Sequence, residues 1–189
     1  MKKIIIVVLL IFTTLWCYAP NLSLSDQIEY SKQSDTYYQL RLKLEHINQL
    51  EHSEFSYNNL VTYMDLLKIE EIEVVIRQAV LESGWFKSDL FVHHNNLFGM
   101  KKPQIRPTTA IGRALGHAKF RHWTDSVKDY VLWQNYFKTI MSIDNIDNYY
   151  AFLSHVGYAE NGKYVALLKS INLEKLQSGN RIANRNCTS

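Results

Sequence analysis

Glu82 is the residue of this chain best placed for acid catalysis. It continues the buried face of a predicted helix, whose apolar positions recur at helical spacing: Ile72, Val75, Ile76 and Ala79. A carboxyl group on such a face is partly removed from water, and desolvation disfavours its charged form. An acid of this kind can keep its proton near neutral pH and donate it to a leaving oxygen, as glycosidic bond cleavage requires.

The residues that flank Glu82 favour a ligand site over an ordinary helix end. Ser83-Gly84-Trp85 breaks the predicted helix directly after the acid, which opens space for a ligand. Trp85 and Phe98 can supply flat apolar surfaces on which sugar rings stack. Position alone leaves the structural alternative open, because many glutamates near helix ends are solvated or cap the helix.

Three separated motifs resemble one known family. The segment from Gln78 to Lys101, QAVLESGWFKSDLFVHHNNLFGMK, resembles the signature of the bacterial glucosaminidases, glycoside hydrolase family 73. Phe120-Arg121-His122-Trp123 with Ser126, and Gly157-Tyr158-Ala159 with Tyr164 and Leu168, resemble further motifs of that family in the same order. The resemblance covers residues 56–176 and includes mannosyl-glycoprotein endo-β-N-acetylglucosaminidase-like proteins.

The resemblance implies a fold and a reaction. The fold class is mainly α (α+β): a lysozyme-like helical domain with a small β-hairpin lobe. The reaction is cleavage of the β-1,4 bond after N-acetylglucosamine in peptidoglycan, with Glu82 as general acid and no cofactor. Tyr158 is the expected catalytic helper, through a hydrogen bond to the acetamido group or by stabilising oxocarbenium-like charge. The expected substrate-binding residues are Trp85, Asn95, Asn96, Phe98 and Tyr164.

Some of these residues also have a structural interpretation. Tyr158 can be a core tyrosine that packs with its ring. Asn95 and Asn96 can cap a turn before Gly99 as well as bind sugar hydroxyls.

The sequence departs from the common family pattern at the second catalytic carboxyl group. Glycosidases usually use two carboxyl groups, yet no Asp or Glu lies between Met100 and Thr124. Three explanations remain open: the substrate's own acetamido group acts as nucleophile, the second function is missing and the domain only binds glycan, or a distant acid folds into the site. The candidates for a distant acid are Asp125, Asp129 and Glu160.

Other chemistries find little support in the sequence. The spacing of the histidines matches no pattern that places ligands on one metal ion, so we expect no metal: His93, His94, His117 and His122. Ser83 lacks the preceding glycine and the strand context of a serine nucleophile elbow. No basic stripe of the kind that binds nucleic acid is present.

The N-terminus indicates export. Residues 1–19 combine two lysines, a short apolar run and Ala19 before Pro20, the pattern of a signal peptide. Because its loss removes two of 21 basic residues against 18 acidic ones, the mature chain is nearly neutral. An uncleaved anchor and a lipoprotein modified at Cys17 are the alternatives. We therefore expect an exported protein of the periplasm, cell envelope or extracellular space. It would act as a monomer on peptidoglycan glycan strands, with membrane contact only through an uncleaved N-terminus.

Periodicity and turn residues predict the remaining organisation. Residues 20–55 form a linker (Asn21 to Ser34) and a first helix (about 36–50), residues 56–176 the catalytic domain, and residues 177–189 a polar tail with Cys187. Within the domain we expect helices near 56–67, 69–82, 88–91, 125–141, 146–153 and 163–173. Pro and Gly between Asn95 and His122 predict a β-hairpin or irregular lobe.

Two rival functions follow from the same residues. A non-catalytic glycan- or peptidoglycan-binding module is favoured by the acid-free lobe and disfavoured by the intact LESGW segment around Glu82. An endo-glucosaminidase acting on glycoprotein or chitin-like chains would use the same site on another substrate.

Overall fold

The computed structural model describes residues 24–142, 148–158, 163–174 and 176. The predicted signal peptide, Cys17, Glu160 and the tail 177–189 lie outside the described residues. The chain divides into two compact units, residues 1–46 and 47–189. Among the described helices, none contains an apolar stretch long enough to cross a membrane.

The N-terminal helix α2 (Leu24–Leu50) is longer than predicted. The stretch predicted as a linker is helical from Leu24 onward. Between Leu24 and Leu50 there is no Gly or Pro to interrupt a helix, and Gln, Glu and Lys are good helix formers. Polar composition therefore does not make this segment a flexible linker.

The second unit is mainly helical, as predicted. Its helices are α3 (Tyr57–Leu66), α4 (Ile72–Glu82), α5 (Asp89–His94), α6 (Trp123–Met141), α7 (Tyr149–His155) and α8 (Tyr164–Ser170). Caps fix several of the boundaries: the Ser56 hydroxyl accepts a hydrogen bond from the Asn59 amide at 3.0 Å, and Ser88 caps α5 in the same way. The motif helix starts at Ile72, three residues later than expected at Ile69, because Glu71 is left-handed (φ 54°).

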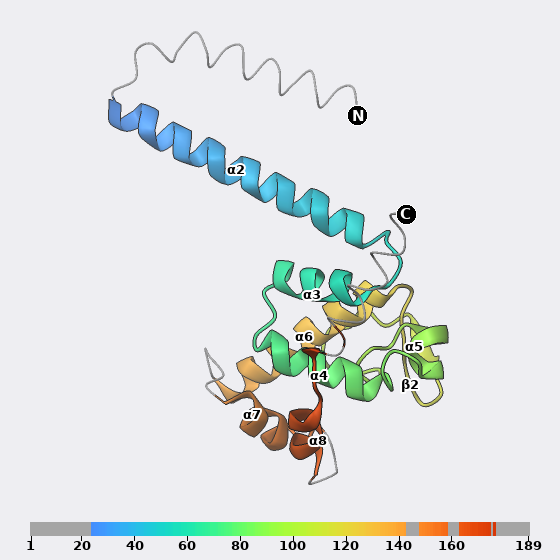
Figure 1. The fold of residues 1–189 in the computed structure, drawn as a ribbon. Coiled ribbons are helices and arrows are strands. Elements are labelled where there is room, and N and C mark those ends of the chain that lie inside the picture. Colours follow the sequence, from blue (N-terminus) through green and yellow to red (C-terminus); the bar gives the residue numbers. More distant parts are fainter. Residues whose placement is uncertain (1–23, 143–147, 159–162, 175, 177–189) are drawn as a thin grey trace. The chain divides into compact units, whose positions relative to one another are not determined.

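Helix α4 lies in the centre of this unit and contacts both α3 and α8 (Figure 1). Its residues Val75, Ala79 and Val80 are fully buried. Aromatic rings fill the space around it, including Trp123 against Tyr63 and Tyr130 against Phe98. The apolar stripe read from the sequence is thus the surface that fixes the position of Glu82 at the end of the helix.

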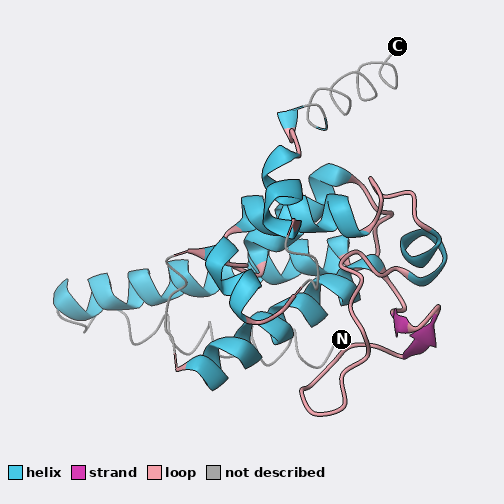
Figure 2. Cartoon of the chain, turned by 90° about the horizontal axis from the view of Figure 1, so that it is seen from below, coloured by secondary structure: helices cyan, strands magenta, loops and turns pink. Residues whose placement is uncertain are grey.

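The small lobe contains a two-stranded antiparallel sheet, β1 (Gly112–Ala114) and β2 (His117–Lys119), which Figure 2 shows in magenta. The turn residues Leu115 and Gly116 both have positive φ, 51° and 78°, as a tight hairpin turn requires. The Ala118 amide donates to the Met100 carbonyl at 2.8 Å. The hairpin is therefore attached to the segment that follows α5, which makes this an α+β fold of the lysozyme-like type.

Candidate active site

Glu82 is the last residue of α4, and a left-handed turn follows it. Gly84, Trp85 and Phe86 have φ values of 56°, 59° and 63°. Such values suit Gly but cost a residue with a side chain about 1–2 kcal/mol. The turn is held by the Trp85 amide, which donates to the Val80 carbonyl at 2.8 Å, and by the Phe86 amide, which donates to the Ser83 hydroxyl at 2.9 Å. This geometry ends the helix at the acid.

Asn96 holds the loop that faces Glu82. Its amide nitrogen donates to the carbonyls of Met100 and Ala118 at 2.9 and 2.8 Å. Its amide oxygen accepts from the amides of Phe98 and Met100 at 3.3 and 3.1 Å. With four hydrogen bonds and no exposed surface, Asn96 has a structural role in this loop, and its predicted contact with the substrate stays a prediction.

Gly99 brings the backbone of this loop against the carboxyl group of Glu82. A Cβ atom at position 99 would lie 2.9 Å from Glu82 Oε2, and the residue has φ 62°. Both observations require glycine here. The loop can approach the acid closely because the position has no side chain.

A groove of about 470 Å³ opens beside Glu82. Its charged lining residues are Glu82, Lys101 and Arg106, so Glu82 is the single carboxyl group among the described residues that line it. The rest of the lining is largely apolar and aromatic: Phe98, Gly99, Met100, Pro103, Gln104, Ile105, Trp133, Tyr136, Phe137, Val156, Gly157 and Tyr158. Such a groove combines one titratable group with flat surfaces, as a sugar site requires.

The pKa of Glu82 is raised above its ordinary value, chiefly because burial removes the carboxyl group from water. A hydrogen bond from Tyr164 and the charge of His117 act in the opposite direction. None of the described Lys or Arg side chains forms an ion pair with Glu82. Glu82 can therefore hold a proton at a pH where most glutamates have lost it.

Tyr158 and Tyr164 both lie beside the acid. Their rings stack with centroids 5.9 Å apart, and burial raises the pKa of each hydroxyl. The Tyr158 hydroxyl donates to the Phe98 carbonyl at 2.9 Å, so its one proton is used and its oxygen remains an acceptor. It can accept from an acetamido N–H but cannot donate to the acetamido oxygen while this bond is kept.

Three of the other predicted sugar contacts are absent from the groove lining: Trp85, Asn95 and Tyr164. Trp85 lies in the left-handed turn, where it is 47% exposed. The sequence does not show the direction of this turn, so it could not predict where the Trp85 ring lies. Asn95 ends α5 at φ 57° and donates to the carbonyls of Phe120 and Arg121. Phe98 lines the groove but is only 1% exposed, because its ring packs on Tyr130 at 4.4 Å.

Neither of the two described candidates for a distant second acid, Asp125 and Asp129, lines the groove. Asp129 is fully buried and forms an ion pair with Arg106 at 2.7 Å, with further hydrogen bonds from the Thr108 hydroxyl and the Thr109 amide. Asp125 pairs with Lys128 at 3.5 Å and is absent from the lining. The placement of Glu160 lies outside the described residues.

Sequence reasoning missed the aromatic wall contributed by α6. Trp133, Tyr136 and Phe137 line the groove, with the Trp133 ring 5.0 Å from that of Tyr158. Their spacing on a predicted helix was the available signal, since residues three and four apart share a face. Nothing in the sequence showed that this face turns toward Glu82.

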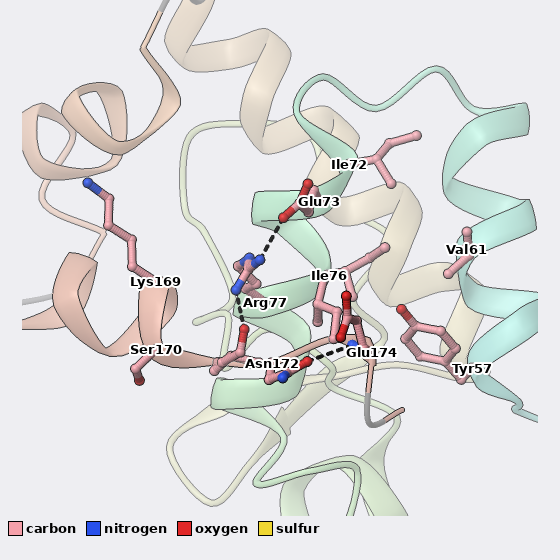
Figure 3. Close-up of a pocket in the computed structure, with 12 residues that line it drawn as sticks. Tyr57, Val61, Ile72, Glu73, Ile76, Arg77, Lys169, Ser170, Asn172 and Glu174 are labelled. Carbon is pink, nitrogen blue, oxygen red and sulfur yellow. Dashed lines mark hydrogen bonds and ion pairs between the residues drawn. The ribbon is translucent and has the colours of Figure 1, made fainter. Parts of the chain in front are cut away.

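A larger cavity of about 850 Å³ lies elsewhere, between α3, α4 and residues 169–174 (Figure 3), and shares no lining residue with the groove. Two of its charged lining residues, Glu73 and Arg77, stabilise the fold. Arg77 pairs with Glu73 at 2.6 Å and donates to the carbonyls of Leu168 and Ile171 at the end of α8. No group of three or more potential metal-ligating side chains occurs in the described parts of the chain.

A desolvated acid in a groove of a mainly helical domain is compatible with a glycan-hydrolase type of site, and the comparisons with known proteins point to the same class. The Glucosaminidase family, described as mannosyl-glycoprotein endo-beta-N-acetylglucosaminidase, matches residues 57–176. Because the match covers more than half of the chain, the chain belongs to this family. Membership supports a glycan-hydrolase type of function.

One curated relative is Protein bax of Escherichia coli strain K12. It is 39% identical over 70 residues, which are 37% of this chain and 26% of that protein. The chain thus spans about a quarter of the length of this relative. No solved structure matches the chain.

Proposed function

We propose that the protein is an exported peptidoglycan hydrolase that cleaves the β-1,4 bond after N-acetylglucosamine, with Glu82 as general acid. The observation that carries this proposal is the half-buried Glu82 carboxyl group, with its raised pKa, in a groove that also has aromatic walls. In the reaction, Glu82 donates its proton to the departing glycosidic oxygen as the bond to the anomeric carbon breaks.

The second catalytic function comes from the substrate. The groove lining among the described residues has one carboxyl group, which favours attack by the substrate's acetamido oxygen on the anomeric carbon. Water then opens the resulting ring and gives a proton back to the Glu82 carboxylate. Two displacements at the same carbon retain the anomeric configuration. Because its proton is donated to the Phe98 carbonyl, the Tyr158 oxygen would accept a hydrogen bond from the acetamido N–H, which strengthens that attack.

The charge of the groove rim favours an anionic glycan over a neutral one. Lys101 lines the groove and is exposed. Between Met100 and Thr124 the lobe has no acid and several further cations besides the paired Arg106: Lys102, Arg113, Lys119 and Arg121. Peptidoglycan bears carboxylates on its lactyl-linked peptides, whereas chitin-like chains bear none.

The test is digestion of purified peptidoglycan, followed by reduction and mass analysis of the fragments, with Glu82→Gln as control. The proposal predicts reduced N-acetylglucosamine ends from wild type only. Reduced N-acetylmuramic acid ends would instead identify a muramidase. Cleavage of N-linked glycoprotein or chitin oligosaccharides, with peptidoglycan left intact, would assign the other endo-glucosaminidase activity.

A non-catalytic glycan-binding module is the second candidate, and the single carboxyl group of the lining favours it. It predicts that wild type and Glu82→Gln bind peptidoglycan equally and that neither releases fragments.

A further inference from the structure

A line of hydrogen-bonded side chains runs through the core of the domain toward Glu82. At its far end, Gln134 Nε2 donates to the Glu70 carbonyl at 3.1 Å and to the Tyr149 hydroxyl at 2.6 Å. The Tyr149 and Tyr130 hydroxyl oxygens are 2.7 Å apart. Tyr130, Tyr149 and Gln134 are exposed by at most 3%, so water does not compete for these bonds.

The near end of the line reaches the acid. The Tyr130 hydroxyl donates to Gln78 Oε1 at 2.5 Å, and Gln78 Nε2 donates to the Tyr164 hydroxyl at 3.2 Å. The Tyr164 hydroxyl is the member of the line that interacts with Glu82, and this interaction acts to lower the pKa of the carboxyl group. Gln78 is fully buried one turn before Glu82 on the same helix.

The number of protons on each group fixes the direction of donation in the hydrogen bonds from Gln134 to Tyr130, the far half of the line. Both atoms that Gln134 Nε2 contacts are oxygens, one of them a carbonyl that can only accept. The amide group therefore donates to Tyr149. A hydroxyl group has one proton, and the proton of Tyr149 is then directed to the Tyr130 oxygen.

The same argument fixes the direction of donation in the hydrogen bonds from Tyr130 to Tyr164, the near half of the line. The proton of Tyr130 goes to Gln78 Oε1, which can only accept. The other end of that amide, Nε2, donates to the Tyr164 oxygen. The single proton of Tyr164 is then left for Glu82, so every hydrogen bond from Gln134 onward points toward the acid.

We propose that Gln134, Tyr149, Tyr130 and Gln78 are positioning residues, which act in relay to hold the Tyr164 hydroxyl as a hydrogen-bond donor to Glu82. The catalytic role of Glu82 in this inference rests on the proposed function. Hydrogen bonds aligned in one direction polarise one another, so a change two or three residues away weakens the last bond. The donated bond occupies one carboxyl oxygen and leaves the catalytic proton for the other.

Other groups face Glu82, and they are separate from this line. His117 on β2 and Tyr158 interact with it electrostatically, and Lys101 and Arg106 share the groove lining. None of these four is a member of the hydrogen-bonded line. An effect of changing Tyr130 therefore reports on the line itself.

The experiment compares Tyr130→Phe with Tyr63→Phe in the full chain. Both substitutions remove one hydroxyl from a fully buried tyrosine and keep the ring. The Tyr63 hydroxyl donates to Glu51, away from the line. The readout is a carbon NMR titration of side-chain carboxyl-labelled glutamate, with the Glu82 signal assigned by its absence in Glu82→Gln. It needs no activity, so it separates this inference from the proposed function.

We expect Tyr130→Phe to move the Glu82 titration to higher pH. Losing the aligned donor disfavours the carboxylate and so raises its pKa further. Where hydrolysis is measured, the basic limb of the pH–rate profile moves the same way. In addition kcat falls by roughly tenfold with little change in KM, the scale on which outer hydrogen-bond partners act in metal sites. Tyr63→Phe leaves both profiles in place.

An unchanged Glu82 titration in folded Tyr130→Phe, or an equal shift in Tyr63→Phe, would overturn the inference. If Tyr130→Phe does not fold, Tyr149→Phe tests the same step from its other side, with the same expected direction. A shifted titration in a protein that cleaves no glycan would support the line of positioning residues and reject the proposed catalytic role.

Discussion

Glu82 and Asp129 are two carboxyl groups held inside the same domain, and their surroundings differ in almost every respect. Asp129 is fully buried, but both of its carboxylate oxygens accept hydrogen bonds from Arg106. Arg106 Nη1 donates to Oδ1 at 3.2 Å and Nη2 donates to Oδ2 at 2.7 Å. The Thr108 hydroxyl and the Thr109 amide complete the set. Glu82 is half-buried beside an open groove and receives a neutral donor, Tyr164.

The comparison distinguishes a carboxyl group that stabilises the fold, Asp129, from one that is a candidate for catalysis, Glu82. The buried Asp129 carboxylate has replaced its lost water by three kinds of donor: a guanidinium cation, a hydroxyl group and a backbone amide. A carboxyl group that loses water without gaining a cation keeps its proton more easily. Burial alone therefore does not mark a candidate catalytic residue, whereas burial without a cation at the edge of a groove does.

The largest expected effect is the loss of stability on removal of the cation next to Asp129. Arg106→Met leaves a buried carboxylate without its partner and should lower the free energy of unfolding by about 3–5 kcal/mol. Denaturant unfolding measures this loss. The exposed pair Lys68–Asp65, at 3.1 Å, supplies the control: Lys68→Met should cost less than about 1 kcal/mol. Equal losses in both variants would refute the structural role of the Arg106–Asp129 pair.

Gly99→Ala should have the opposite effect to Arg106→Met: it acts on Glu82 and should lower turnover more than stability. Its Cβ would meet Glu82 Oε2 at 2.9 Å, so the carboxyl group must move and turnover should fall by roughly tenfold to a hundredfold. Gly116→Ala is the matched control, because Gly116 also has positive φ (78°) but nothing lies within 4 Å of the added carbon. We predict that Gly99→Ala and Gly116→Ala lose similar amounts of stability and that only Gly99→Ala loses turnover. Equal activity in the two variants would contradict it.

Thr108→Val should weaken only the Asp129 region. It removes the hydroxyl that donates to Asp129 Oδ1 at 2.5 Å. The ion pair remains, so the expected loss of stability is smaller, about 1–2 kcal/mol. The pH dependence of hydrolysis should be unchanged in this variant. A displaced pH profile would mean that the two carboxyl groups are coupled.

The smallest effect is a pH-dependent difference in stability between wild type and Glu82→Gln. Because folding raises the pKa of Glu82, its contribution to stability is fully present below the unfolded-state pKa and is lost as pH rises through the folded-state value. Glu82→Gln has no such loss. The Tm of the variant minus that of wild type should therefore increase with pH across this interval. A constant difference would mean that folding leaves the proton affinity of Glu82 unchanged.

The parts of this comparison that sequence could predict are those set by local pattern. The apolar stripe placed Glu82 at the end of a buried helix, and Ser56 and the hairpin glycines marked real boundaries. The α+β class and the family followed from motifs along one continuous region.

What sequence could not predict depends on contacts between distant segments. The burial of Asn96 could not be predicted because an exposed asparagine and a buried one have the same local pattern, and only its four bonds to the loop and hairpin distinguish them. Asp129 became a structural acid through Arg106, 23 residues away. The left-handed turn at Trp85 is a backbone choice that Gly84 allows but does not require.

The most direct test of the account is a paired measurement of turnover and affinity on Glu82→Gln. Peptidoglycan hydrolysis and binding are measured on the same preparation at the pH optimum of wild type. The account predicts that turnover falls by about 10²–10⁴-fold, the range that a general acid contributes, while affinity for the glycan is unchanged. Turnover in Glu82→Gln close to that of an active wild type would contradict the assignment of Glu82 as the acid.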